Sequence, residues 1–121
     1  MYKRLPCYLR TQRKQWALTQ SELARLLGLK SAQHVSRLER GRRQPSVSVL
    51  LAVEIIFGEH PRDLFPKLFD AIEERTVRFL YGMQQRLAGE DKRASERRRQ
   101  FAAEALRRAA ESANPHYDYQ P

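Results

Sequence analysis

The chain has 121 residues, with 23 Lys and Arg against 14 Asp and Glu, and a formal net charge of +9 at pH 7. This length allows one compact domain with an appendage, and the single cysteine, Cys7, excludes an internal disulfide. No apolar run approaches the roughly 20 residues that cross a bilayer, and the first residues are too polar for a signal peptide. We therefore expect a cytoplasmic protein.

The positive charge is concentrated in the first half of the chain. Residues 1–60 hold eleven Lys and Arg against four Asp and Glu, a net charge of +7, whereas residues 61–121 hold twelve against ten, a net charge of +2. A basic surface of this kind suits a nucleic-acid partner, although a merely solvated surface would carry the same excess. The charge alone does not decide between the two.

Only helices are predicted, because apolar residues recur at spacings of three and four and no sustained alternation indicates strands. The first helix has Leu5, Leu9, Arg13 and Trp16 on one face.

The second predicted helix begins near Gln20. Thr19 can cap it, and Glu22, three residues later, can complete a capping box. Gly28 ends the helix, because glycine adopts positive φ without penalty. The apolar and small positions that recur at helical spacing are Leu23, Ala24, Leu26 and Leu27.

The third predicted helix runs from Ser31 to Arg40, with Ser31 as its natural N-cap. Val35 and Leu38 point inward, and Gly41 closes the helix. The opposite side is basic and hydrogen-bonding, since it carries Gln33, Ser36, Arg37 and Arg40. Two short helices joined by a turn with a glycine indicate a helix-turn-helix.

Two further short helices complete the first half. One follows Pro45 and Ser46 and ends at Gly58, and Pro61 opens another that runs through Phe65. The fourth helix offers the core five apolar side chains: Val49, Leu50, Val53, Ile56 and Phe57.

Beyond Pro66 we expect a longer helix, a break near Gly89 and a last helix from about Asp91 to Ser112. The longer helix carries Leu68, Ile72, Phe79, Leu80, Met83 and Leu87. The last helix carries one narrow apolar stripe in a charged segment. This stripe either folds back on the chain's own core or forms a dimer or partner surface. Its members are Phe101, Ala102, Ala105, Leu106 and Ala109.

The stretch from Leu5 to Pro66 resembles the Cro/CI-type (XRE) family of small helix-turn-helix regulators. One departure is that Gly28 and Val35 are one residue further apart than is usual. The resemblance implies an all-α, five-helix lambda-repressor-like domain that binds double-stranded DNA. The matching positions are Thr19, Gln20, Glu22, Leu23, Ala24, Gly28, Val35, Ser36, Glu39, Gly41 and Pro45.

These observations predict three regions. Residues 1–66 form the helix-turn-helix DNA-binding domain, residues 67–113 form a C-terminal helical extension for dimerisation or partner contact, and residues 114–121 form a disordered tail. The extension follows the domain without an internal repeat.

The resemblance implies that Ala32, Gln33, Ser36 and Arg37 face the bases, with His34 beside them. The amide of Gln33 suits adenine and the guanidinium of Arg37 suits guanine. By the same resemblance, Gln20 contacts a phosphate and braces the third helix, and Arg13 and Glu39 form a structural ion pair. The full predicted DNA-binding set is Gln20, Lys30, Ser31, Ala32, Gln33, His34, Ser36, Arg37, Arg40, Arg42 and Arg43.

Enzymatic function is not expected. The three histidines, His34, His60 and His116, are scattered, and none lies at metal-ligand spacing with Cys7 or a carboxylate. No phosphate-cradling glycine loop occurs. We therefore predict a protein without metal or cofactor.

The leading hypothesis is a sequence-specific transcription regulator, a repressor that occupies a palindromic operator as a homodimer. The alternative is an antitoxin or mobile-element adaptor, whose C-terminal helices bind a protein partner and whose DNA binding is autoregulatory. RNA binding is less favoured, because the exposed face of the motif lacks aromatic stacking platforms.

Overall fold

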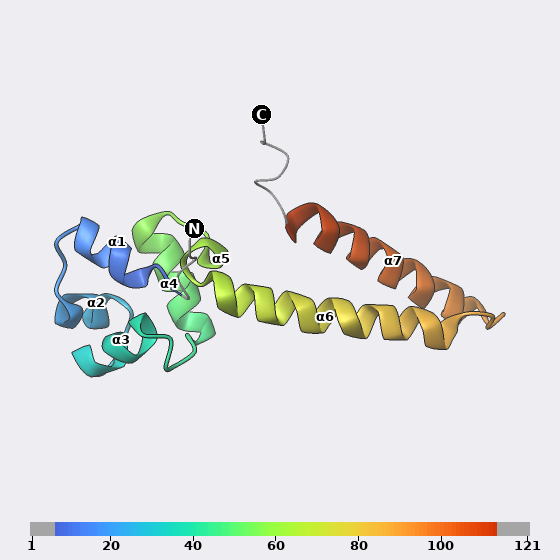
Figure 1. Ribbon diagram of the computed structural model, residues 1–121, viewed down its shortest axis with the longest axis horizontal. Coiled ribbons are helices and arrows are strands. Elements are labelled where there is room, and N and C mark those ends of the chain that lie inside the picture. The colour runs from blue at the N-terminus through green and yellow to red at the C-terminus, as the bar shows by residue number, and fades with distance from the viewer. Residues whose placement is uncertain (1–6, 114–121) are drawn as a thin grey trace, which may run out of the picture. The chain divides into compact units, whose positions relative to one another are not determined.

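The computed structural model describes residues 7–113, and they form seven α-helices with no strand among them (Figure 1). This confirms the predicted all-α class, with five short helices followed by two long ones. Leu5 and the predicted tail Asn114–Pro121 lie outside the described residues. The helices are α1 Leu9–Gln15, α2 Gln20–Leu26, α3 Ala32–Glu39, α4 Val47–Phe57, α5 Pro61–Leu64, α6 Pro66–Leu87 and α7 Arg93–Ala113.

The chain divides inside α6 into two compact units. The first ends at Asp70 and the second begins at Ala71. The division lies close to Pro66, where the sequence changes character and where α6 begins.

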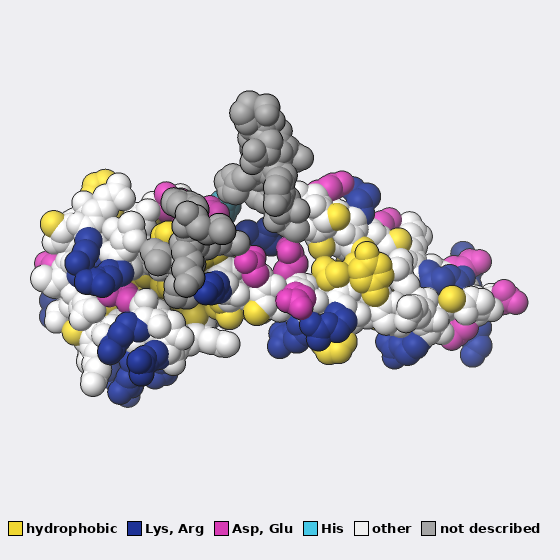
Figure 2. Space-filling view, viewed as in Figure 1, with side chains coloured by type: hydrophobic (Ala, Val, Ile, Leu, Met, Phe, Trp, Pro, Cys, Tyr) yellow, Lys and Arg dark blue, Asp and Glu magenta, His cyan; other side chains and the backbone are white. Residues whose placement is uncertain are grey.

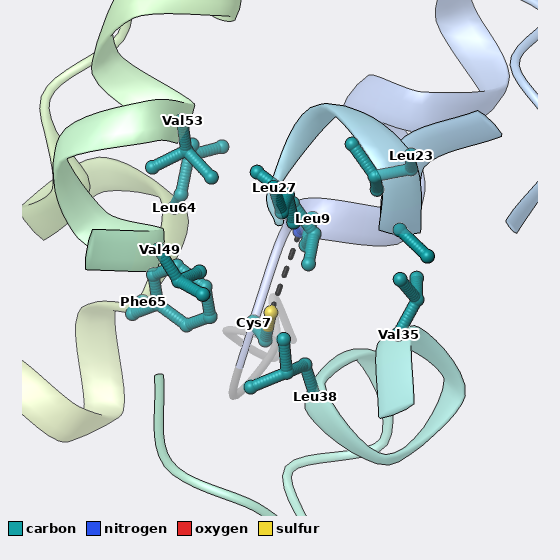
Figure 3. Close-up of a cluster of buried hydrophobic side chains, with 11 residues drawn as sticks. Cys7, Leu9, Leu23, Leu27, Val35, Leu38, Val49, Val53, Leu64 and Phe65 are labelled. Carbon is teal, nitrogen blue, oxygen red and sulfur yellow. Dashed lines mark hydrogen bonds between the residues drawn. The ribbon is translucent and has the colours of Figure 1, made fainter. Parts of the chain in front are cut away.

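One hydrophobic cluster holds the first unit together, and helices α1 to α5 all contribute to it (Figure 3). Leu9 of α1, Leu23 of α2, Val35 of α3 and Val53 of α4 are completely buried. Burial of such a side chain contributes about 1.5–3 kcal/mol, so the packing of these five helices carries most of the stability of the unit. The cluster consists of Cys7, Leu9, Leu23, Ala24, Leu27, Val35, Leu38, Val49, Val53, Leu64 and Phe65.

Cys7 lies in this cluster, just before the start of α1. The backbone N–H of Leu9 donates a hydrogen bond to Cys7 Sγ over 3.4 Å (Figure 3). Burial raises the pKa of the Cys7 thiol to about 11, although the hydrogen bond from Leu9 opposes the shift. The thiol is therefore protonated at neutral pH.

The first three helices end in the same backbone motif. After each helix the chain passes through a residue with positive φ, namely Ala17 (56°), Gly28 (72°) and Gly41 (72°). The N–H of this residue and the N–H of the next residue donate back to carbonyls of the last turn, as in the Schellman motif. After α1, for example, Ala17 donates to Lys14 and Leu18 donates to Arg13, each over 3.0 Å.

The turn after α1 corrects one expectation. Trp16 does not share the buried face of α1 with Leu9, because it is 63% exposed. The helix ends at Gln15, and Trp16 is its C-cap, so the chain has already begun to turn at this residue. Leu26 of α2 is likewise exposed, although its neighbours Leu23 and Leu27 are buried.

Predicted caps fix the bounds of α4 and α5. The Ser46 hydroxyl accepts a hydrogen bond from the N–H of Val49, and Gly58 ends α4 in the left-handed conformation. Pro61 occupies the first turn of α5, where its missing N–H costs nothing. The predicted starts and stops of both helices are confirmed.

In the second unit, α6 and α7 form an antiparallel hairpin around the predicted break at Gly89 (Figure 1). Polar contacts hold the turn: the Ser95 hydroxyl donates to Glu90 Oε1 over 2.7 Å, and Arg99 donates to the carbonyls of Leu87 and Glu90. Only Leu87, Ser95 and Ala102 are buried among the described residues of this unit. The predicted stripe on α7 thus packs partly within the hairpin, but Phe101 does not, since it is 55% exposed.

No helix within residues 7–113 combines the length and the apolar character that crossing a membrane requires.

Candidate nucleic-acid interface

Helix α2 begins with the predicted capping box. The Glu22 N–H donates to Thr19 Oγ1 over 3.0 Å, and the Thr19 N–H donates to Glu22 Oε1 over 2.9 Å. These reciprocal bonds satisfy two backbone donors that a helix start leaves open, and they hold the pKa of Glu22 below its ordinary value. The start of α2 is therefore fixed by local sequence.

A hydrophobic anchor holds the turn between α2 and α3. The Leu29 N–H donates to the carbonyl of Ala24 over 2.8 Å, and the Leu29 side chain packs against the core cluster. Gly28 supplies the positive φ of the motif. Lys30 and Ser31, which follow the anchor, are exposed.

Ser31 stands at the N-cap of α3 in an extended conformation, but its side chain makes no capping hydrogen bond. The expectation of a serine side-chain cap is therefore wrong. The Ser31 backbone carbonyl instead accepts the N–H of His34 over 3.1 Å, so this early amide of α3 is satisfied without the hydroxyl.

Helix α3 buries one side and presents the other to solvent. Val35, Leu38 and Glu39 are buried, whereas Gln33 and Arg37 are exposed. At 3.6 residues per turn, Gln33 and Arg37 lie one above the other on the side opposite the core. The other two predicted base-facing residues, Ala32 and Ser36, flank this pair, and they and the neighbouring His34 are partly buried.

A buried carboxylate ties α3 to the two helices before it. Glu39 accepts two hydrogen bonds from Arg13 of α1, from Nε over 2.6 Å and from Nη2 over 3.2 Å. It also accepts one from Gln20 Nε2 of α2 over 3.1 Å. The side chains of Arg13 and Glu39 are 11% and 3% exposed, so solvent screens the ion pair little. This network fixes the C-terminal end of α3 against α1 and α2.

The cationic residues around α3 are solvent-exposed. The Schellman motif after α3 positions Arg42, whose N–H donates to the carbonyl of Arg37 over 2.9 Å, and Arg43 follows it. Figure 2 shows a group of Lys and Arg side chains over α3, the helix labelled at the same place in Figure 1. The exposed cations of this region are Lys30, Arg37, Arg40, Arg42 and Arg43.

The pKa of His34 is affected by the positive charge of this surface. Its pKa lies below the ordinary value, first because of partial desolvation and then because of the charges of Arg43 and Arg37. The three side chains are therefore close enough to interact, and the site disfavours a further cation. An anion bound at this surface would raise the pKa of His34.

One contact of this region has no signal in the sequence. Arg13 Nη1 donates to the backbone carbonyl of Leu18 over 3.0 Å, which attaches the turn after α1 to the Arg13–Glu39 pair. A backbone acceptor carries no side-chain signature, and its position depends on the positive φ of Ala17, a residue type that rarely adopts it. The residue types of the turn therefore do not predict the bond between Arg13 and the Leu18 carbonyl.

The arrangement is that of a two-helix DNA reader: a braced second helix, a polar outer face and cations at both of its ends. In the described part of the chain, no three His, Cys, Asp or Glu side chains come together as a metal site would require.

A protein-family model described as helix-turn-helix matches residues 9–64, which span α1 to α5. Residues 9–64 form a helix-turn-helix domain of the Cro/CI-type (XRE) family, a family of DNA-binding transcription regulators. The family is generally non-enzymatic. Comparisons with curated proteins and with solved structures give no significant match.

Proposed function

We propose that the protein is a sequence-specific repressor that inserts α3 into the major groove of a palindromic operator as a homodimer. The observation that carries the proposal is the exposed Gln33–Arg37 pair on a helix whose other side is locked by Glu39. A side chain specifies a base only if its backbone is held in register. The Arg13–Glu39–Gln20 network supplies that rigidity.

In this proposal Gln33 pairs with adenine and Arg37 with guanine, each contributing about 1–3 kcal/mol of discrimination. Ala32 contacts a thymine methyl group, and Ser36 and His34 contact neighbouring base edges. Two such helices in a dimer would lie about 34 Å apart, one turn of duplex.

Phosphate contacts would set the register of α3 on the duplex. Gln20 bonds to Glu39 through its amide nitrogen, and its second amide hydrogen is available for a phosphate oxygen. We assign the remaining phosphate contacts to exposed residues that precede or follow the Gln33–Arg37 pair in the chain: Lys30, Ser31, Arg40, Arg42 and Arg43.

The test is selection of bound duplexes from a random-sequence pool with the full chain. Enrichment of an inverted repeat, with a preference over scrambled DNA that persists as salt rises, is the expected result. Binding without enrichment, lost steeply with added salt, would contradict the proposal, because contacts to phosphates alone have that signature.

A second candidate function is favoured by the second unit. Phe79 and Phe101 remain more than half exposed on α6 and α7, and exposed apolar patches on a soluble chain mark interaction sites. In this alternative the C-terminal helices bind a protein partner, as in an antitoxin or mobile-element adaptor, and DNA binding is autoregulatory. Light scattering on the purified chain separates a self-association surface from one that awaits another protein.

A further inference from the structure

The side of α6 next to its contact with α7 is apolar and uncovered. Leu87 is buried and Leu80 is partly buried, and we infer from this that their side of α6 faces α7. Ile72, Phe79 and Met83 follow one another at helical spacing about a quarter turn away. Ile72 is 42% exposed and Phe79 is 68% exposed, so α7 leaves this stripe open.

Helix α7 has a matching stripe. Ala102 is completely buried in the hairpin, whereas Phe101, about a quarter turn from it, is 55% exposed. Because the two helices run in opposite directions, Phe101 and Ala105 lie on the same side of the hairpin as Ile72 and Phe79. Figure 2 shows hydrophobic side chains over this pair of helices. The apolar face consists of Ile72, Phe79, Met83, Phe101 and Ala105.

Arginines predominate on this side of the hairpin. By the same helical geometry, Glu104 lies on the helical row of Arg97 at the edge of this side, whereas the acidic residues Glu74, Glu96 and Glu111 point elsewhere. Two of them pair with arginines there: Arg78 with Glu74 over 3.2 Å and Arg107 with Glu111 over 2.9 Å. The arginines around the apolar face form no ion pair within residues 7–113; they are Arg75, Arg86, Arg97, Arg98 and Arg108.

We propose that this face binds an acidic amphipathic helix of another protein, with its apolar side on Phe79 and Phe101 and its carboxylates against the surrounding arginines. The proposal specifies the partner of the second candidate function and does not require that α3 read DNA. A helix laid along a two-helix groove is a recurrent mode of recognition. Charge complementarity across the rim then selects the partner.

A second copy of this chain is a poor occupant. It would bring five further arginines to a rim that already holds five and contributes one carboxylate, that of Glu104, and like charges brought together across an interface are unfavourable. A DNA duplex suits the arginines but not the apolar centre, since an aromatic side chain carries about 150–250 Å² of surface and the two phenylalanines are more than half exposed. An acidic helix matches both parts.

The test uses the full chain and two synthetic helical peptides that share a leucine face and differ in their flanking residues, glutamate in one and lysine in the other. Fluorescence anisotropy should give about tenfold tighter binding of the glutamate peptide, the scale of a few exposed ion pairs. Phe79→Ser and Phe101→Ser should abolish binding. Combined Arg86→Glu and Arg98→Glu substitutions should transfer the preference to the lysine peptide.

Matched controls lie on the other sides of the hairpin. Tyr81→Ser removes an aromatic side chain that is 56% exposed, and Arg78→Glu reverses a charge outside the rim. Neither should change peptide binding, and circular dichroism should show all variants helical.

Three results would overturn the proposal. One is equal affinity for the two peptides. Another is a dimer in light scattering that Phe79→Ser dissociates, which would make a second copy the occupant. The last is Phe79-dependent binding to anionic phosphatidylglycerol vesicles without binding to the glutamate peptide.

Discussion

Arg13 Nε and Glu39 Oε2 lie 2.6 Å apart, although 26 residues separate them in the chain. The pair joins the first helix of the domain to the last residue of α3, and Gln20 joins the same carboxylate to α2. The Glu39 carboxylate thus controls the orientation of the helix that we propose to face DNA.

Glu39→Gln should lower the free energy of unfolding by about 3 kcal/mol, because it leaves the Arg13 guanidinium largely buried without its counter-charge. Urea denaturation of the full chain measures the change. The matched control is Glu74→Gln, which breaks an exposed pair with Arg78 and should leave the unfolding midpoint nearly unchanged. Equal effects of the two substitutions would refute the bracing role.

Ala17→Gly should stabilise the domain by about 0.5–1 kcal/mol. Ala17 has a φ of 56°, a conformation that costs an L-residue about 1–2 kcal/mol, and part of this gain is offset by the greater freedom of glycine in the unfolded chain. Thermal unfolding compares this variant with Ala103→Gly, placed in the interior of α7, which should be destabilising. A loss of stability in Ala17→Gly would show that the strain inferred at this turn is absent.

Cys7 should resist thiol reagents in the folded protein. Its pKa of about 11 keeps the thiol protonated at neutral pH, and the thiolate is the reactive form. Rapid labelling with a disulfide reagent in native buffer, at the rate seen in urea, would be inconsistent with the buried site.

The same thiol links stability to alkaline pH. Because the pKa of Cys7 in the folded protein is raised above its ordinary value of 9.0, the unfolded state loses the proton first. The contribution of Cys7 to stability is thus complete below about pH 9 and is lost as the pH rises toward 11. The decline in this window should be steeper for the natural chain than for Cys7→Ala, and parallel curves for the two would count against the shift.

Binding of DNA should strengthen as the pH falls through the range in which His34 titrates. In the free protein partial desolvation and the charges of Arg43 and Arg37 lower the pKa of His34, whereas nearby phosphates would raise it. A ligand that raises a pKa binds the protonated form more tightly, so affinity should increase from about pH 7.5 to about pH 5.5. His34→Gln should flatten this dependence, while His60→Gln, near Glu54 in the α4 region, should retain it. Identical pH profiles for all three proteins would remove His34 from the interface.

Local sequence signals predicted the helix starts and ends that depend on the residues of a single turn. The Thr19–Glu22 capping box, the Ser46 cap and the glycines at positions 28, 41 and 58 all act over three or four residues, and each ends or begins a helix where the sequence predicts it. The all-α class follows from these signals, because they divide the chain into helices of the right length.

Sequence signals did not predict the structure correctly where it depends on tertiary packing or on an unusual backbone conformation. Periodicity placed Trp16 with Leu9, but α1 ends one residue earlier in a turn made by an alanine with positive φ, which no residue type announces. Ser31 is a residue type that favours the N-cap, but its side chain makes no capping hydrogen bond. The Arg13 bond to the Leu18 carbonyl and the exposure of Phe101 depend on packing between segments, which periodicity within one helix does not encode.

The central claim, that the outer face of α3 reads bases, is tested most directly by the affinities of Arg37→Ala and Arg43→Ala for the selected operator and for random duplex at one salt concentration. We predict that Arg37→Ala weakens binding to the operator by about 1–3 kcal/mol and relaxes preference at one base pair, with little change on random DNA. Arg43→Ala should weaken binding to both duplexes similarly. Equal losses on operator and random DNA for both variants would contradict the claim.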